Sequence, residues 1–111
     1  MITDAPRDHE GKGRNFCPTD LVATALGSCL LTVMGIKAKK EKWNLYGLKL
    51  EINKHMSKLG PRKIDTLVIS IFTPSNLNAD QLNVLKKEIN DCPVLRNIES
   101  STNINLLWTQ Q

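Results

Sequence analysis

The stretch that decides the fold is DLVATALGSCLLTVMGIK, residues 20–37. Between its charged ends, residues 21–36 carry no charge at all. A membrane span needs about 20 apolar residues, without this density of Thr, Ser and Gly. We therefore interpret the run as a central helix buried in a globular fold. Because such a helix is apolar on every side, we expect a sheet and a second subunit to cover it.

The predicted helix begins at Pro18 and ends at about Lys40. Proline is favoured at the first helical position, which places Cys17 near the N-cap. Asp20 then lies in the first turn, where a negative charge stabilises the helix dipole. Small residues surround Cys29 in the middle of the run, so another element of the fold can approach the helix backbone closely.

The rest of the chain predicts an α+β arrangement. Apolar residues alternate at Leu48, Leu50 and Ile52, which is typical of a half-buried strand within residues 43–56. The β-branched run 64–72 predicts a second strand, antiparallel to the first. Leu82, Leu85 and Ile89 recur at helical spacing within residues 78–90, where Asn78 is a suitable N-cap.

The C-terminal part predicts a short helix that starts at Cys92 and Pro93, followed by a final strand over residues 102–109. Residues 1–16 are polar and rich in turn formers, so we expect an irregular loop there. The length of 111 residues indicates a single domain, 1–111, with its core in residues 17–111.

Composition excludes several classes of function. The chain has 15 Lys and Arg against 11 Asp and Glu, a net charge of +4, but no dense basic cluster and only 5% aromatic residues. Nucleic-acid binding is therefore disfavoured. The two histidines, His9 and His55, are isolated and no CxxC pair occurs, so we expect neither a metal site nor a cofactor.

Three cysteines without a signal peptide indicate a reducing cytoplasm rather than a disulfide framework, and no membrane partner is expected. Cys92 is either a thiolate stabilised by a helix N-terminus or simply a small cap residue. Cys29 is either a core cysteine or a reactive thiol, in which case it needs a cation nearby, most naturally an arginine. For Cys17 we favour a cap over a spare thiol.

Two of these thiols could form a transient pair. A thiolate that attacks the O–O bond of a peroxide becomes a sulfenic acid. A second thiol then condenses with it to a disulfide, which an external dithiol reduces.

At these residues the chain resembles the OsmC/Ohr family of osmotically induced and organic-hydroperoxide-resistance proteins. The run 16–29, FCPTDLVATALGSC, resembles the proline-led helix of the family that ends in a cysteine. The run 91–94, DCPV, resembles its Cys-Pro motif. The order of elements also matches from the first helix to the last strand.

The resemblance implies an OsmC-like fold, in which a long buried central helix packs on an antiparallel sheet. It also implies an intertwined homodimer whose two central helices are covered by sheets, with sites at the subunit interface. It implies that Cys29 is the peroxidatic cysteine and Cys92 the resolving one. The implied substrate is an organic hydroperoxide, and the implied reductant is a dithiol such as a lipoyl group or another cellular thiol.

This sequence departs from the family pattern in two places. Peroxidase members carry a glutamate after the helix-opening proline, where this chain has Thr19. Their catalytic arginine comes from N-terminal strands, which we expect this short member to lack. Arg7, Arg14 and Arg62 are conceivable substitutes, and none is assigned a catalytic role.

Three hypotheses for function follow. The first is a thiol-dependent reductase of organic hydroperoxides that acts in oxidative-stress defence through Cys29 and Cys92. The second keeps the fold and the thiols but acts as a redox sensor or small-ligand binder with weak turnover. The third is a purely structural dimer module.

Overall fold

The order of elements follows the sequence closely. The computed structural model describes residues 11, 13 and 16–111, so most of the predicted loop 1–16 lies outside the described residues. The elements in chain order are α1 (Pro18–Glu41), β1 (Lys49–Met56), β2 (Ile64–Thr73), α2 (Ala79–Glu88), η2 (Ile89–Asp91), α3 (Pro93–Ile98) and β3 (Asn103–Gln110). Every helix and strand predicted from the pattern is present, with ends shifted by a few residues at most.

The sheet has three strands in the order β1-β2-β3. β1 and β2 are antiparallel, as predicted, with Leu50 opposite Ile71 and Ile52 opposite Ile69. The expectation of a wholly antiparallel sheet is wrong, because β3 runs parallel to β2. A short hairpin can only join antiparallel strands, whereas the chain from β2 to β3 crosses over through α2, η2 and α3, and such a crossover permits parallel pairing.

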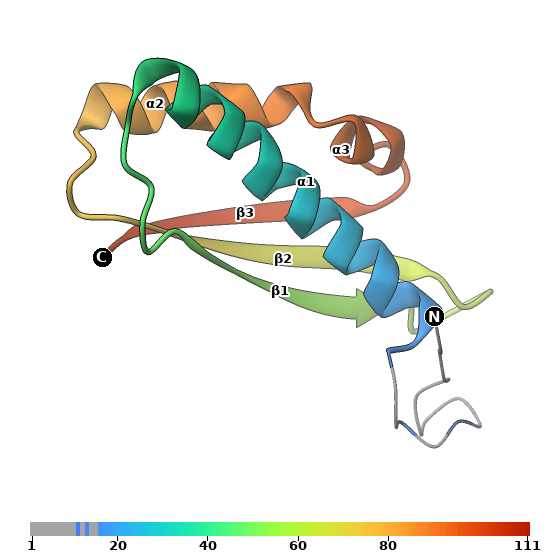
Figure 1. Cartoon of the computed structure of the whole chain (residues 1–111). Coiled ribbons are helices and arrows are strands. Elements are labelled where there is room, and N and C mark those ends of the chain that lie inside the picture. The colour runs from blue at the N-terminus through green and yellow to red at the C-terminus, as the bar shows by residue number, and fades with distance from the viewer. Residues whose placement is uncertain (1–10, 12, 14–15) are drawn as a thin grey trace.

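The helices cover one face of this mixed sheet, which gives an α+β fold of two layers (Figure 1). Side chains alternate between the faces of a strand, and in β2 the buried set is Leu67, Ile69, Ile71 and Thr73. In β1 and β3 every second residue is exposed on the opposite face. The hydrophobic core therefore lies between the sheet and the helices.

The inner face of α1 lies at the centre of that core. Leu26, Leu30 and Met34 have no exposed surface, and they recur at the spacing of one helix face. α1 contacts β1, β2, α2, η2 and α3. This single helix thereby connects the sheet to the α2–α3 layer.

Gly27 allows α1 to approach β1 closely. A Cβ atom added at Gly27 would lie 2.6 Å from Cδ1 of Ile52 and 3.2 Å from Cδ2 of Leu50. A separation of 2.6 Å is far inside van der Waals contact, so any side chain here forces the Ile52 side chain to shift. The small residues predicted to admit a neighbouring element thus do so at Gly27.

The outer face of α1 is apolar but exposed in the single chain. Val22, Leu31 and Ile36 are 39%, 37% and 51% exposed. Within the described residues, other elements cover only one side of α1, so the expectation that both sides are covered is met in part. Within that part of the chain, α1 is also the one helix long and apolar enough to cross a membrane, a test that the core helix of a soluble protein passes too.

Replacing Gly27 with alanine should destabilise the chain. Overpacking costs about 1–3 kcal/mol, while alanine regains about 1 kcal/mol of helix propensity. We expect the free energy of unfolding, measured with urea, to fall by about 1 kcal/mol.

Two controls define this prediction. Gly35 has no atom within 4 Å of an added Cβ, so Gly35→Ala meets no clash within the chain. Ile52→Val removes the atom closest to the new methyl group, so it should reduce the cost of Gly27→Ala in the double variant. Equal effects of Gly27→Ala and Gly35→Ala, with no coupling to Ile52→Val, would contradict close packing at Gly27.

Candidate functional site

The structure brings Cys29 and Cys92 together, although 63 residues separate them in the chain (92 − 29 = 63). Cys29 projects from the middle of α1 and is partly exposed, whereas Cys92 has no exposed surface. Cys29 packs against the core cluster that contains Cys92 and raises the pKa of the Cys92 thiol, so the two side chains are neighbours. Both are free thiols.

Cys92 occupies the N-cap of α3, as the sequence predicts. Its sulfur accepts a hydrogen bond from the backbone N–H of Leu95 at 3.4 Å. The proline at position 93 provides the first helical residue. The cap role and a redox role are compatible, because the cap bond leaves the sulfur in contact with Cys29.

The pKa of the Cys92 thiol is raised above its ordinary value of 9.0. Burial is the largest cause, and the hydrogen bond with Cys29 and the charge of a Cys29 thiolate raise the pKa further. The backbone N–H of Leu95 acts in the opposite direction and is outweighed. Cys92 therefore stays a neutral thiol that can donate a proton beside Cys29.

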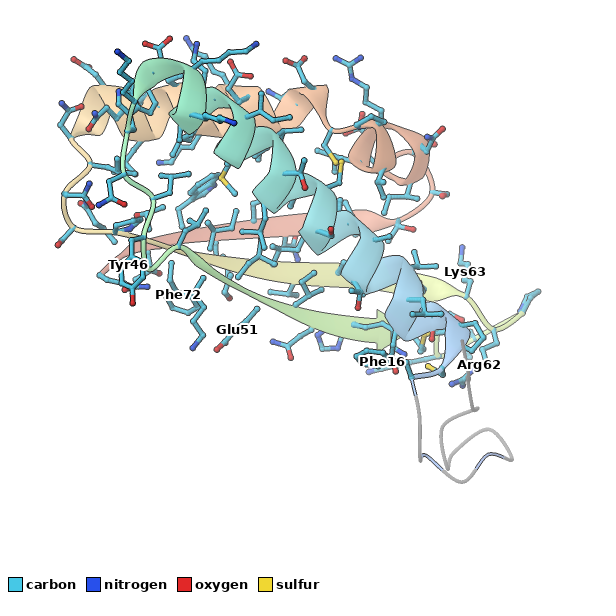
Figure 2. The ribbon with its side chains drawn as sticks, viewed as in Figure 1. Phe16, Tyr46, Glu51, Arg62, Lys63 and Phe72 are labelled. Carbon is cyan, nitrogen blue, oxygen red and sulfur yellow. The ribbon has the colours of Figure 1, made fainter. Side chains whose placement is uncertain are left out.

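Within residues 11, 13 and 16–111, the arginine expected beside Cys29 is not found bonded to it. Arg96, close to Cys92 in sequence, donates instead to the backbone oxygen of Asn90 and to the carboxylate of Asp91. Arg62 lies in the exposed turn between β1 and β2 (Figure 2). Arg7 and Arg14 lie outside the described residues.

A second polar cluster lies at the other end of α1, and sequence reasoning missed its central residue, Lys54. Its ammonium donates to Asp20 Oδ1 at 2.7 Å, to Thr19 Oγ1 at 2.7 Å and to Cys17 Sγ at 3.3 Å. The alternation that places Leu50 and Ile52 on the inner face of β1 also assigns Lys54 to that face. That signal was present in the sequence.

Cys17 is the N-cap of α1, as predicted. Its backbone N–H donates to Asp20 Oδ2 at 3.3 Å, which completes a capping box. Asp20 thus binds the helix end and Lys54 together. The pKa of its carboxyl is lowered, chiefly by the hydrogen bond from Lys54 and then by that with Cys17.

A cavity of about 780 Å³ runs along the flank where α1 meets β1. Its polar end is formed by Asp20 and Lys54, and its apolar wall includes Leu31, Leu50 and Ile52. Cys29 and Cys92 are not among its lining residues. Within the described part of the chain, no group of three or more His, Cys, Asp or Glu side chains is placed to hold a metal ion.

Comparison with known proteins identifies relatives of this fold. A family model described as OsmC-like protein matches residues 11–107. A structure from Psychrobacter arcticus 273-4, provisionally described as an osmotic stress induced and detoxification response protein, is 35% identical. The alignment covers 97% of this chain and 78% of that one, with a TM-score of 0.89.

Two more distant structures share the fold. An organic hydroperoxide resistance protein OsmC from Legionella pneumophila is 18% identical, with 96% of this chain and 78% of that one covered and a TM-score of 0.74. The organic hydroperoxide resistance protein OhrB of Bacillus subtilis is 16% identical, with 95% and 76% covered and a TM-score of 0.72. The comparison with curated proteins gives no match.

The raised pKa of Cys92 predicts a specific dependence of stability on pH. The folded-state pKa of Cys92 lies above 9.0, so the folded protein favours the protonated thiol. The contribution of this thiol to stability is complete below pH 9.0 and is lost as pH rises through the folded-state pKa. The free energy of unfolding should therefore fall between about pH 8 and about pH 10. Urea unfolding across this range should show a smaller fall in Cys92→Ala than in the parent. An identical fall in both proteins would show that Cys92 titrates normally.

Proposed function

Because the chain belongs to the OsmC-like protein family, we propose that it is a thiol-dependent reductase of organic hydroperoxides that uses Cys29 and Cys92. The observation that carries this proposal is that Cys29 and Cys92, 63 residues apart in the chain, are neighbours in the fold. Relatives named as organic hydroperoxide resistance proteins share the fold, which supports the substrate class.

In the first step Cys29 attacks the peroxide as a thiolate. A lone pair of the Cys29 sulfur bonds to one peroxide oxygen, the O–O bond breaks, and the alkoxide leaves with the electron pair. Cys29 is oxidised to the sulfenic acid and the hydroperoxide is reduced to an alcohol once the alkoxide gains a proton. Cys92 is a suitable proton donor, because its raised pKa keeps it protonated beside Cys29.

In the second step Cys92 resolves the sulfenic acid. Its sulfur attacks the Cys29 sulfur, the S–O bond breaks, and water leaves as the disulfide forms. A dithiol reductant then restores both thiols by thiol–disulfide exchange and is itself oxidised to a disulfide. No cofactor or metal ion takes part in this cycle.

Burial supports the assignment of the two roles. Cys29 is partly exposed in the single chain, so its thiol is the more accessible of the two to a hydroperoxide. Cys92 is fully buried and packs in the core cluster, so it meets Cys29 but not a large substrate. All three cysteines are free thiols, as expected in a reducing compartment. We therefore propose that the protein is cytoplasmic.

We further propose that the protein acts as a homodimer. Ile36 lies on the outer face of α1 and Val22 and Leu31 lie on its two flanks; all three are exposed, and no other described element covers this face. A second copy of the chain that packs its own α1 here would remove this face from water. The apolar flank of the nearby cavity would be enclosed by the same contact.

One observation favours the alternative of a redox sensor with weak turnover. Thr19 replaces the family glutamate, and its hydroxyl accepts a hydrogen bond from Lys54 rather than holding an arginine. Without a cation at Cys29, attack on the peroxide would be slow, while the disulfide could still form. Turnover therefore separates the two functions.

Steady-state reduction of cumene hydroperoxide with dihydrolipoamide tests the proposal. The parent should turn over, and Cys29→Ser should lose activity to the background rate because it lacks the attacking thiolate. Cys92→Ser should stop after about one turnover, because its sulfenic acid has no resolving thiol. The exposed Ser75→Ala is the matched control. A parent rate equal to that of Cys29→Ser would reject the reductase.

The oligomeric state is tested by light scattering after size-exclusion chromatography. The parent should be a dimer, and Leu31→Lys or Ile36→Lys should produce monomers because a charge would be buried between the helices. Tyr46→Lys changes a residue that is 90% exposed outside α1 and should leave the dimer intact. A monomeric parent would contradict the proposed interface.

A further inference from the structure

Cys17 lies at the N-terminus of α1, separated from Cys29 by about 18 Å along the helix at 1.5 Å per residue. The proposed reductase does not use this thiol. Although Cys17 is only 3% exposed, its surroundings are polar. That combination distinguishes it from Cys92, which is buried among apolar side chains.

Two side chains from different elements converge on the Cys17 sulfur. Thr19 Oγ1 lies at 3.1 Å, and Lys54 Nζ on β1 donates to the sulfur at 3.3 Å. Lys54 also donates to Thr19 Oγ1, so the hydroxyl hydrogen of Thr19 is available for the sulfur. A sulfur that receives an ammonium and a hydroxyl donor is suited to the thiolate form.

The charges around this sulfur are Lys54 on β1 and Asp20 on α1. Burial lowers the pKa of Lys54, but its bonds to Asp20 and Cys17 outweigh that effect and raise it, so the ammonium persists. The hydrogen bond from Thr19 lowers the pKa of Cys17 most strongly, and hydrogen bonds from the backbone N–H of Asp20 and from Lys54 lower it further. Burial and the Asp20 carboxylate raise it. The balance favours a thiolate.

We propose that Cys17 is a second oxidation site, a thiolate held by Lys54 and Thr19 that reacts with hydrogen peroxide to form a sulfenic acid. The Cys17 sulfur attacks one oxygen of the peroxide, the O–O bond breaks, and hydroxide leaves with the electron pair. Cys17 loses two electrons and the peroxide gains them. Lys54 supplies a proton to the hydroxide, which becomes water, and solvent reprotonates the amine.

The product at Cys17 is a reversible modification rather than a step in a cycle. Cys29 and Cys92 lie together at the middle of α1, too far away to form a disulfide with Cys17. The sulfenic acid remains beside the Lys54 ammonium until a small external monothiol attacks it, with loss of water, to form a mixed disulfide. A second monothiol reduces this disulfide by exchange and restores the Cys17 thiol. Because Cys17 caps α1, its oxidation state acts directly on the end of the central helix.

Burial sets the size of the oxidant. With 3% of the residue exposed, the sulfur can meet hydrogen peroxide but not a bulky organic hydroperoxide. The two cysteine sites thus differ in substrate class, and the proposal for Cys17 stands independently of that for Cys29 and Cys92.

The test uses Cys29→Ser/Cys92→Ser, in which Cys17 is the one remaining thiol. Free thiol is counted by alkylation in denaturant after timed exposure to hydrogen peroxide over a range of pH. Cys17→Ser added to this variant corrects for methionine oxidation in the intact mass. The folded variant should react faster at neutral pH than the same chain in denaturant, because a lowered pKa of Cys17 increases the fraction of thiolate.

Variants of the two donors assign the effect to the cluster. Lys54→Gln should slow oxidation and move the pH profile to higher pH, while Lys54→Arg should restore both. Thr19→Val should also slow oxidation and move the pH profile to higher pH. This variant tests the proposal if Lys54→Gln does not fold. Rates and profiles unchanged in Thr19→Val and Lys54→Gln, or a folded rate no faster than the denatured one, would overturn the proposal. Cumene hydroperoxide reacting as fast as hydrogen peroxide would overturn the limit on size.

Discussion

The packing of α1 against the sheet is the constraint on which the rest of the structure depends. Gly27 lets the helix approach Ile52 and Leu50 so closely that no side chain fits between them. That contact determines how far α1 lies from β1 and how the helix is rotated about its axis. In consequence, Cys29 meets Cys92 in the middle of the helix, and the first turn of α1 meets Lys54 on β1. One packing contact therefore positions two separate thiol sites.

The two sites show how environment, rather than residue type, determines cysteine chemistry. Cys92 is surrounded by apolar side chains and a neighbouring thiol, so its pKa rises and it serves as a proton donor. Cys17 is equally buried but faces an ammonium and a hydroxyl, so its pKa falls. In the proposed cycle the neutral thiol resolves an oxidised partner. In the proposed switch the thiolate is itself the reactive group.

Much of the fold could be predicted from local patterns in the sequence. The uncharged run 21–36 and Pro18 define α1, and the alternation around Leu50 defines β1. The parallel pairing of β3 could not be predicted in this way, because strand direction depends on the crossover through α2 and α3 and not on side-chain alternation. The exposure of the outer face of α1 could not be predicted either, because a sequence pattern does not say which side of a helix the rest of the chain will cover.

The candidate site was predictable in part. The family resemblance paired Cys29 with Cys92, and the fold places them in contact. The alternation in β1 places Lys54 on the inner face, but its partners Asp20 and Cys17 lie more than 30 residues away in the chain, so their contact with Lys54 could not be read from a local pattern.

The pairing of Cys29 with Cys92 is the central claim, and peptide mapping after one equivalent of cumene hydroperoxide tests it most directly. The account predicts a single Cys29–Cys92 disulfide that a dithiol reverses, with Cys17 outside it. Sulfinic acid at Cys29 with Cys92 still free, or a disulfide that includes Cys17, would contradict it.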